Sequence, residues 1–155
     1  MNYRKVLIAV DASENSLRAV EYTGRILGCS EGMCTTDLHI ELLSVTRPPQ
    51  KDLFADEQEW EKKSRELEAR SHEFLEQART ILEDLKVPRQ SISTRHLCTM
   101  EPSIAQNILE VQEEGGFGTI VVGRRGMSKA EEFLMGSVSN KVVHYAKNCT
   151  VWVVQ

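Results

Sequence analysis

The sequence predicts a single α/β domain over residues 1–155, with an open, parallel five-stranded sheet and helices on both faces. Its 155 residues and 17.6 kDa are enough for one sizeable core and too few for two ordinary ones. Short apolar runs alternate with segments of helical periodicity, the order typical of parallel sheets. These runs are apolar on both faces, as strands covered by helices on each side are.

The first half of the pattern has two strands and one helix before a proline pair. Lys5–Val10 is a continuous aliphatic run and is predicted to be a buried strand. Ser13–Leu27 repeats apolar residues at three- and four-residue steps, as an amphipathic helix does. Leu38–Val45 is the second strand, and Pro48-Pro49 prevents its continuation.

A long amphipathic helix is expected from about Asp56 to Lys86. The segment is dense in charge, but Trp60, Leu67 and Phe74 keep one face apolar. Pairs of opposite charge four residues apart add local support. An acidic linker would explain the charge and leave the leucine and aromatic spacing unexplained.

The second half completes the alternation, with Gly115-Gly116 ending its first helix. The expected elements are a more polar strand, a helix, an apolar strand, a helix and a last strand, in the order Ser91–Cys98, Pro102–Glu114, Thr119–Val122, Ser137–Lys147 and Thr150–Val154. We find no internal repeat and no low-complexity tract.

Composition and charge exclude several classes of protein. Nineteen basic and 23 acidic residues give a net charge of −4, so nucleic acid is not expected as a partner. The longest apolar runs, such as Val6–Val10, are far too short to cross a bilayer, and no secretory leader is evident. The four cysteines lack the spacing of a zinc site or a disulfide framework. We therefore expect a cytoplasmic protein with reduced thiols.

The segment after the fourth expected strand is the best candidate for a ligand site. It begins Gly123-Arg124-Arg125-Gly126 and, nine residues later, reaches a helix start at Gly136-Ser137-Val138-Ser139. Glycines permit positive φ and close approach of a ligand to the main chain. The unpaired N–H groups and the dipole of a helix start favour an anion. Hydroxyls of the serines and the basic side chains, including Lys129, would assist, which suggests phosphate binding.

Other interpretations of these residues remain open at this point. The glycines could form only a turn, Ser137 could only cap its helix, and the arginines could be solvated. Asp11 could cap the first helix or accept hydrogen bonds from ribose hydroxyls. A Walker A motif is absent, and the acidic turn after the first strand disfavours classical NAD and FMN binding. The isolated Asp11 also disfavours a phospho-accepting receiver.

The pattern Gly123-x-x-Gly126-(nine residues)-Gly136-Ser137, between Ile120-Val121-Val122 and the final apolar strand, resembles the ATP-binding branch of the universal stress protein family. The opening Val6–Ser13 is similar to the family's first strand and turn, so the resemblance covers nearly the whole chain. It implies a Rossmann-like sheet of the adenine nucleotide alpha hydrolase-like type. Ala12 and the Arg124-Arg125 pair depart from the residues that are more usual at those positions.

The resemblance also implies a nucleotide across the strand ends, usually ATP with Mg²⁺ or Mn²⁺. Apolar residues would line the adenine, an aspartate would hold the ribose, and the glycine loop and helix start would bind the phosphates. Carried over by position, these binding residues are Ala9, Val10, Asp11, Val45, Gly123, Gly126, Gly136, Ser137, Val138 and Ser139. Arg124 is added as a candidate because its charge could strengthen phosphate binding, although it departs from the family's pattern. No catalytic residue and no metal-ligating side chain is assigned.

The expected function is that of an ATP-binding regulatory protein of stress physiology, whose nucleotide influences dimer or protein-partner contacts. Members of the family often form homodimers through the last strand, here Thr150–Val154, whose open apolar edge would favour pairing. Two alternatives are a nucleotide-independent interaction module and a slow ATPase or phosphotransferase. The intact loop disfavours the first alternative, and the absence of an evident catalytic base disfavours the second.

Overall fold

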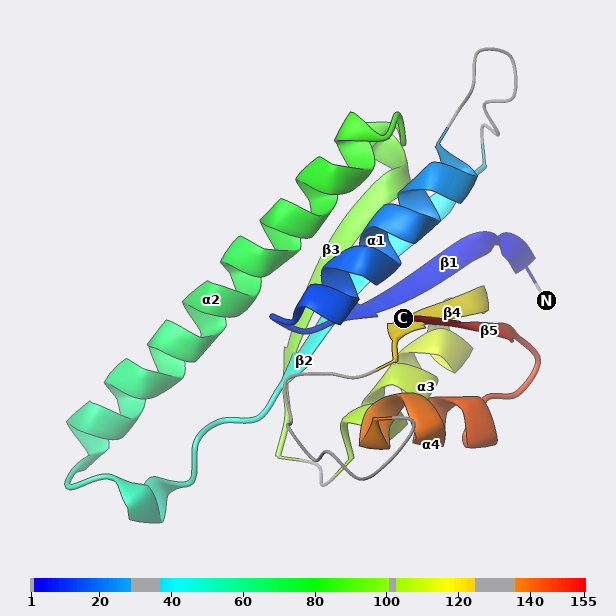
Figure 1. Ribbon diagram of the computed structural model, residues 1–155. Helices are drawn as coiled ribbons and strands as arrows, with labels where there is room; N and C mark the ends of the chain where they lie inside the picture. The colour runs from blue at the N-terminus through cyan, green and yellow to red at the C-terminus, as the bar shows by residue number, and fades with distance from the viewer. Residues whose placement is uncertain (1, 29–36, 101–102, 125–135) are drawn as a thin grey trace.

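The computed structural model describes residues 2–28, 37–100, 103–124 and 136–155 (Figure 1). Strands and helices alternate along the chain as the sequence predicts. The strands are β1 (Asn2–Val10), β2 (His39–Thr46), β3 (Ile92–Cys98), β4 (Phe117–Gly123) and β5 (Thr150–Val154). The α-helices are α1 (Glu14–Leu27), α2 (Glu57–Asp84), α3 (Ile104–Gly115) and α4 (Ser137–Tyr145).

The five strands form one parallel sheet in the order β3-β2-β1-β4-β5. From β1 the chain steps outward to β2 and β3, then returns across β1 to β4 and β5. Because parallel crossovers are right-handed, this reversal places α1 and α2 on one face and α3 and α4 on the other. The strand order thus reverses between β1 and β4, where open α/β sheets bind their ligands.

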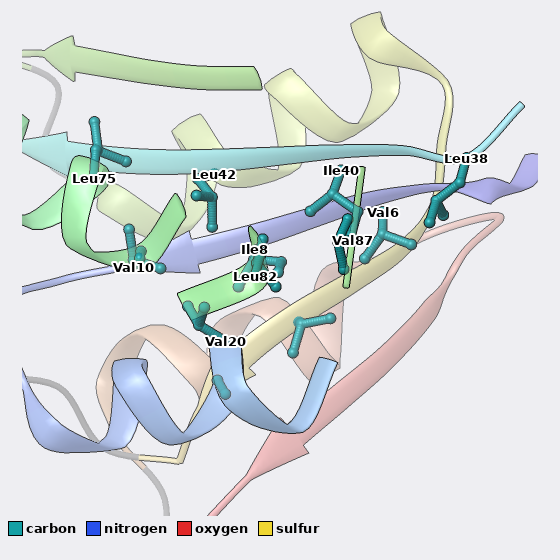
Figure 2. Packing of buried hydrophobic residues seen from close by; sticks show 13 residues of the cluster. Val6, Ile8, Val10, Val20, Leu38, Ile40, Leu42, Leu75, Leu82 and Val87 are labelled. Carbon is teal, nitrogen blue, oxygen red and sulfur yellow. The ribbon is translucent and has the colours of Figure 1, made fainter. Parts of the chain in front are cut away.

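One hydrophobic core lies between the sheet and the helices α1 and α2. Figure 2 shows alternate residues of β1 and β2 pointing into it, including Val6, Ile8 and Leu42. Leu75 and Leu82 of α2 pack against these residues from the helix side of this core and are at most 2% exposed. The apolar stripe predicted for the long helix is therefore the face that it buries.

A second core lies on the opposite face, under α3 and α4. Leu7 and Leu43 point into it from β1 and β2, and Ile108 and Val142 come from the two helices. All four residues are buried. Leu7 and Ile8, which are adjacent in β1, enter opposite cores, which explains why this strand is apolar on both faces.

Element ends differ from the expected ones by a few residues. β1 begins at Asn2 because Asn2 already pairs with Phe117 of β4. Helix α3 begins at Ile104 with Ser103 as its N-cap, and Pro102, which we expected in its first turn, lies outside the described residues. Gly116 ends α3 as expected, with φ of 64°. None of the helices in the described ranges combines the length and the apolar composition that a membrane crossing requires.

Candidate functional site

A cleft of about 470 Å³ opens at the carboxyl ends of the central strands, where the strand order reverses. This volume is in the range of small-molecule sites. Nine of the predicted site residues line it. They are Ala9, Val10, Asp11, Val45, Gly123, Gly136, Ser137, Val138 and Ser139. The tenth, Arg124, is not among the lining residues, and Gly126 lies outside the described residues together with Arg125 and Lys129.

The start of α4 forms one wall of the cleft. Gly136 is the N-cap, and no side chain caps this helix end. The amide of Gly136 donates to the Arg124 carbonyl at 2.9 Å, so it is already used. Among the described residues, no acceptor is found for the amides of Ser137, Val138 and Ser139, the first three of the helix. These three N–H groups and the helix dipole make this wall suitable for an anion.

The two serines of this turn differ in their environment. Ser139 is 3% exposed, and its hydroxyl donates to the carbonyls of Arg124 at 2.7 Å and of Gly136 at 3.1 Å. It therefore fixes the preceding loop onto the helix. Ser137 is exposed and lines the cleft. Of the two hydroxyls, that of Ser137 is the better placed to reach a ligand.

Asp11 follows β1 at the opposite side of the reversal point. Its Oδ1 accepts hydrogen bonds from the hydroxyls of Ser13 and Ser16, the latter at 2.6 Å, and its amide donates to Ser16 Oγ at 2.9 Å. The N-cap of α1 is Ser13, whose side chain accepts from the Ser16 amide. The two serines thus orient a carboxylate that lines the cleft and does not itself cap the helix.

Arg124 connects the start of α4 to the last strand. Its amide donates to the Val154 carbonyl at 2.6 Å, which extends the pairing of β4 with β5 by one residue. Its guanidinium Nη1 donates to Gln155 Oε1 at 2.8 Å. Its carbonyl accepts from Gly136 and Ser139. In this position Arg124 contacts the start of α4 through its backbone and the end of the chain through both its backbone and its side chain.

Gly123 is required for close packing at the end of β4. A Cβ at this position would lie 2.9 Å from the backbone carbonyl carbon and oxygen of Asn15 in α1. Among the described glycines only Gly116 has a positive φ, and Gly136 has an ordinary φ of −64°. The freedom that the sequence suggested for this loop is therefore used at Gly123 for close approach and not for a left-handed turn.

Sequence reasoning missed the contribution of α2 and of three basic residues. Leu67, Arg70, Ser71 and Phe74 of α2 line the cleft, and their spacing of i, i+3, i+4 and i+7 places them on one helical face. That spacing was available in the sequence, but only its apolar members were noted. Arg47 after β2 and Lys141 on α4 also line the cleft.

The cleft is apolar at one end and carries basic side chains elsewhere. Leu43 and Val45 of β2 meet Ile104 and Ile108 of α3 among the lining residues, which suits a flat ring. Arg47, Arg70 and Lys141 stand against a single acidic side chain in the described lining, that of Asp11. The chain as a whole has a net charge of −4, whereas the described lining of the cleft has more basic than acidic side chains.

The chain is similar to proteins of one family along its whole length. The model of the universal stress protein family matches residues 2–155. Universal stress protein YxiE of Bacillus subtilis is 27% identical over 99% of both chains. Among solved structures, the hypothetical protein MJ0577, used as a test case for structure-based assignment of biochemical function, has a TM-score of 0.79 at 21% identity, covering 99% of this chain and 96% of that one.

Two solved structures of universal stress proteins are nucleotide complexes. A universal stress protein in complex with cAMP has a TM-score of 0.68 at 21% identity, covering 99% of this chain and 97% of the other. The universal stress protein from Archaeoglobus fulgidus in complex with dAMP has a TM-score of 0.58 at 18% identity over the full length of both chains. The family match over almost every residue, and the five-stranded parallel sheet shared with these structures, show that this chain belongs to the universal stress protein family.

Proposed function

We propose that this protein binds ATP across the carboxyl ends of β1, β2 and β4 and acts as a nucleotide-dependent regulator in the stress response. The observation that supports it most is the start of α4. Three main-chain amides without a described acceptor line a cleft that also contains Arg47, Arg70 and Lys141. Such a combination favours a ligand with several negative charges attached to an apolar ring.

The proposed orientation follows from the chemistry of each wall. Adenine lies against Ala9, Val10 and Val45, because these residues supply the apolar part of the cleft near β1 and β2. The ribose hydroxyls donate to the carboxylate of Asp11, which Ser13 and Ser16 orient. The phosphates lie at Gly123 and along the turn of Gly136–Ser139, with Gly126 assigned by resemblance alone.

A divalent metal fits this arrangement as a companion of the phosphates. Asp11 is the one carboxylate in the described lining, so this part of the cleft offers no cluster of acidic ligands. Mg²⁺ is commonly held by substrate phosphates with one or two carboxylates and water, and it neutralises phosphate charge when bound. The residues of this chain would then orient the base and the ribose and donate main-chain hydrogen bonds to the phosphate oxygens.

Two structural relatives support an adenine nucleotide as the ligand class. Their complexes contain cAMP and dAMP, which each have a single phosphate. The choice of a triphosphate for this chain depends on the three basic residues of the cleft. We propose that the whole chain, residues 1–155, is one nucleotide-binding domain and that it acts in the cytoplasm, where ATP and Mg²⁺ are available.

Replacing Ser137 tests the role of the main chain directly. Proline is tolerated at the first helical position, and Gly136, with φ of −64° and ψ of 155°, already has the extended conformation that precedes proline. Ser137→Pro removes one amide donor and the hydroxyl, and Ser137→Ala removes the hydroxyl alone. A charge-assisted hydrogen bond contributes about 1.5–3 kcal/mol, so Ser137→Pro should weaken ATP binding about 10- to 100-fold. Titration calorimetry with ATP and Mg²⁺ measures both variants.

Several outcomes would contradict the proposal. If the unchanged protein fails to bind ATP at millimolar concentration with Mg²⁺, the chain is an interaction module that does not use nucleotide. Equal affinities in Ser137→Pro and Ser137→Ala would show that this amide does not contact phosphate. Stoichiometric conversion of bound ATP to ADP under single-turnover conditions would favour the slow ATPase, and recovery of intact ATP would exclude it.

The regulatory part of the proposal depends on Arg124. Phosphates bound at the start of α4 would contact the first turn of that helix. Arg124 joins this turn, through hydrogen bonds, to Val154 and Gln155 at the end of the chain. β5 is an edge strand of the sheet, and its Trp152 packs edge-on against Tyr22 of α1, which is 47% exposed. An edge strand with no neighbour on its outer side among the described strands, beside the exposed Tyr22, suits pairing with a second copy. We therefore propose a homodimer through β5 whose stability changes with nucleotide.

Sedimentation velocity over a range of protein concentrations tests the dimer. With ATP and Mg²⁺ the dimer dissociation constant should differ from its value in the nucleotide-free protein. The same experiment with Arg124→Ala, which removes the contact with Gln155 but keeps the backbone, should reduce that difference. A protein that remains monomeric throughout contradicts the dimer and leaves the nucleotide proposal standing.

A further inference from the structure

A group of three potential metal ligands lies outside the cleft, between α2 and β3. Glu68 and His72 are one turn apart on α2, and His96 is on β3. One ligand atom from each residue lies within 4.8 Å of the others. The rings of His72 and His96 are 5.2 Å apart at 65°, and His72 Nε2 is 3.9 Å from Glu68 Oε1. None of the three lines the nucleotide cleft.

The donors match a borderline transition metal better than Mg²⁺ or Ca²⁺. Imidazole nitrogen suits Zn²⁺, Co²⁺, Ni²⁺ and Cu²⁺, whereas Mg²⁺ and Ca²⁺ prefer oxygen. The spacing of Glu68 and His72 by four residues places both side chains on one face of α2. Two histidines and one carboxylate are also the ligands of several zinc sites that keep an open position for water.

The three side chains can move into coordinating positions. Ligand atoms about 2.0–2.1 Å from a tetrahedral Zn²⁺ are about 3.3 Å from one another, so the group must contract by about 1.5 Å at most. The side chains of Glu68 and His72 are 60% and 59% exposed, which leaves their rotamers unrestricted by packing. His96 is half-buried and provides the fixed side of the group.

His96 is prepared for this role by its surroundings. Thr46 Oγ1 lies 2.8 Å from its Nε2, and among the described residues Nδ1 has no hydrogen-bond partner. Metal-bound histidines commonly hydrogen-bond through the nitrogen that does not bind the metal.

We propose that Glu68, His72 and His96 form a binding site for a divalent transition metal, with Zn²⁺ as the reference ion. The metal joins α2 to β3, an edge strand of the sheet. Figure 1 shows that α2 extends beyond the sheet at its N-terminal end. Leu67, Arg70 and Ser71, in the same turns, line the cleft. Metal binding would therefore fix one cleft wall, and this holds whether or not the nucleotide is ATP.

The test uses the full-length, tag-free chain after removal of metals with a chelator that is then dialysed away. ZnCl₂ is titrated into the protein in a buffer that contains excess Mg²⁺ and no nucleotide. Calorimetry should then show one Zn²⁺ site with a dissociation constant below about 10 μM. His72→Gln and His96→Gln should each weaken it at least ten-fold. Glu68→Gln should also weaken it, because an amide oxygen is a poorer ligand than a carboxylate. Zn²⁺ should raise the melting temperature of the unchanged chain and should not raise that of His72→Gln.

Two matched controls separate this site from other Zn²⁺ ligands. His144→Gln changes an exposed histidine on α4, and Cys98→Ser changes the exposed thiol two residues from His96. Both controls should retain the full affinity. The proposal is overturned if the unchanged chain binds no Zn²⁺, or if binding persists in His72→Gln and His96→Gln. Loss of binding in Cys98→Ser overturns it as well, because the thiol would then be the principal ligand. His72→Gln is a surface change and should leave the melting temperature in chelator unchanged.

Discussion

The two helix starts that flank the reversal point of the sheet differ in how their polar groups are satisfied. At α1, Ser13 caps the helix, and Ser13 and Ser16 donate to Asp11. At α4, no side chain caps the helix, and the amides of Ser137 to Ser139 have no acceptor among the described residues. The first start carries its own anion, whereas the described residues place none at the second.

This difference indicates which side of the cleft binds charge. Both N-caps have extended backbone and both helix starts carry the positive end of a helix dipole, so the contrast in their capacity for an anion comes mainly from their side chains. Asp11 already supplies a carboxylate beside α1, which would repel a phosphate there. At the start of α4 the N-cap is a glycine, which carries no charge, and Lys141 of the same helix also lines the cleft. Phosphate should therefore bind at α4, and Asp11 should meet the neutral part of the ligand.

Placing a carboxylate at the start of α4, like the one beside α1, should produce the largest loss of ATP affinity. Gly136→Asp places a carboxylate at the N-cap, where the backbone conformation suits any residue. Two unit charges 4 Å apart repel by about 4 kcal/mol at an effective dielectric constant of about 20. We expect ATP affinity to fall by at least about 100-fold. The helix itself should gain a few tenths of a kcal/mol from the new cap. Calorimetric titration and urea unfolding measure the two quantities.

Gly136→Asn is the matched control for this change. Asparagine caps a helix about as well as aspartate but has no charge. It should stabilise α4 to a similar extent and weaken ATP binding much less than Gly136→Asp does. If the two variants bind ATP equally, charge at this helix start does not determine binding, and the contrast between the two starts has no functional meaning.

Gly123→Ala should disturb both starts together, because Gly123 of β4 touches the beginning of α1. The added Cβ would lie 2.9 Å from the Asn15 backbone, which cannot rotate away as a side chain could. Overpacking of this kind costs about 1–3 kcal/mol, and each kcal/mol lowers the melting temperature of a chain of this size by about 2–4 °C. Differential scanning calorimetry measures the loss, and ATP affinity should fall with it.

Gly116→Ala separates this local effect from general instability. Gly116 has φ of 64° and no atom within 4 Å of its ideal Cβ, so alanine there is strained only in its backbone, by about 1–2 kcal/mol. Gly116 does not line the cleft. This variant should melt earlier and bind ATP normally. Equal losses of affinity in the two variants would mean that Gly123 acts only through global stability.

The fold was predictable because its signals are local and repeated. Most strands are short apolar runs, with β3 more polar, and α2 shows its buried stripe over 28 residues. The cleft was predictable only in part, because strand ends can be located from sequence but helix faces that turn toward them cannot. Arg70 and Lys141 reach the cleft through the packing of α2 and α4, which no spacing in β4 or its loop indicates. Likewise, His72 and His96 are 24 positions apart in sequence, and only the packing of α2 on β3 brings them together.

Removing the cap of α1 should produce the smallest change in ATP affinity, and it tests the comparison at the helix start that is not expected to bind phosphate. Ser13→Ala leaves the Ser16 amide without its side-chain acceptor and Asp11 with one hydroxyl donor in place of two. The loss of an N-cap serine costs about 1 kcal/mol, which urea unfolding detects. Because Ser16 still donates to Asp11 at 2.6 Å, the carboxylate should keep its orientation and ATP affinity should change by less than about two-fold. A ten-fold loss of affinity at unchanged stability would place the α1 start within the binding surface, and the two starts would then share one role.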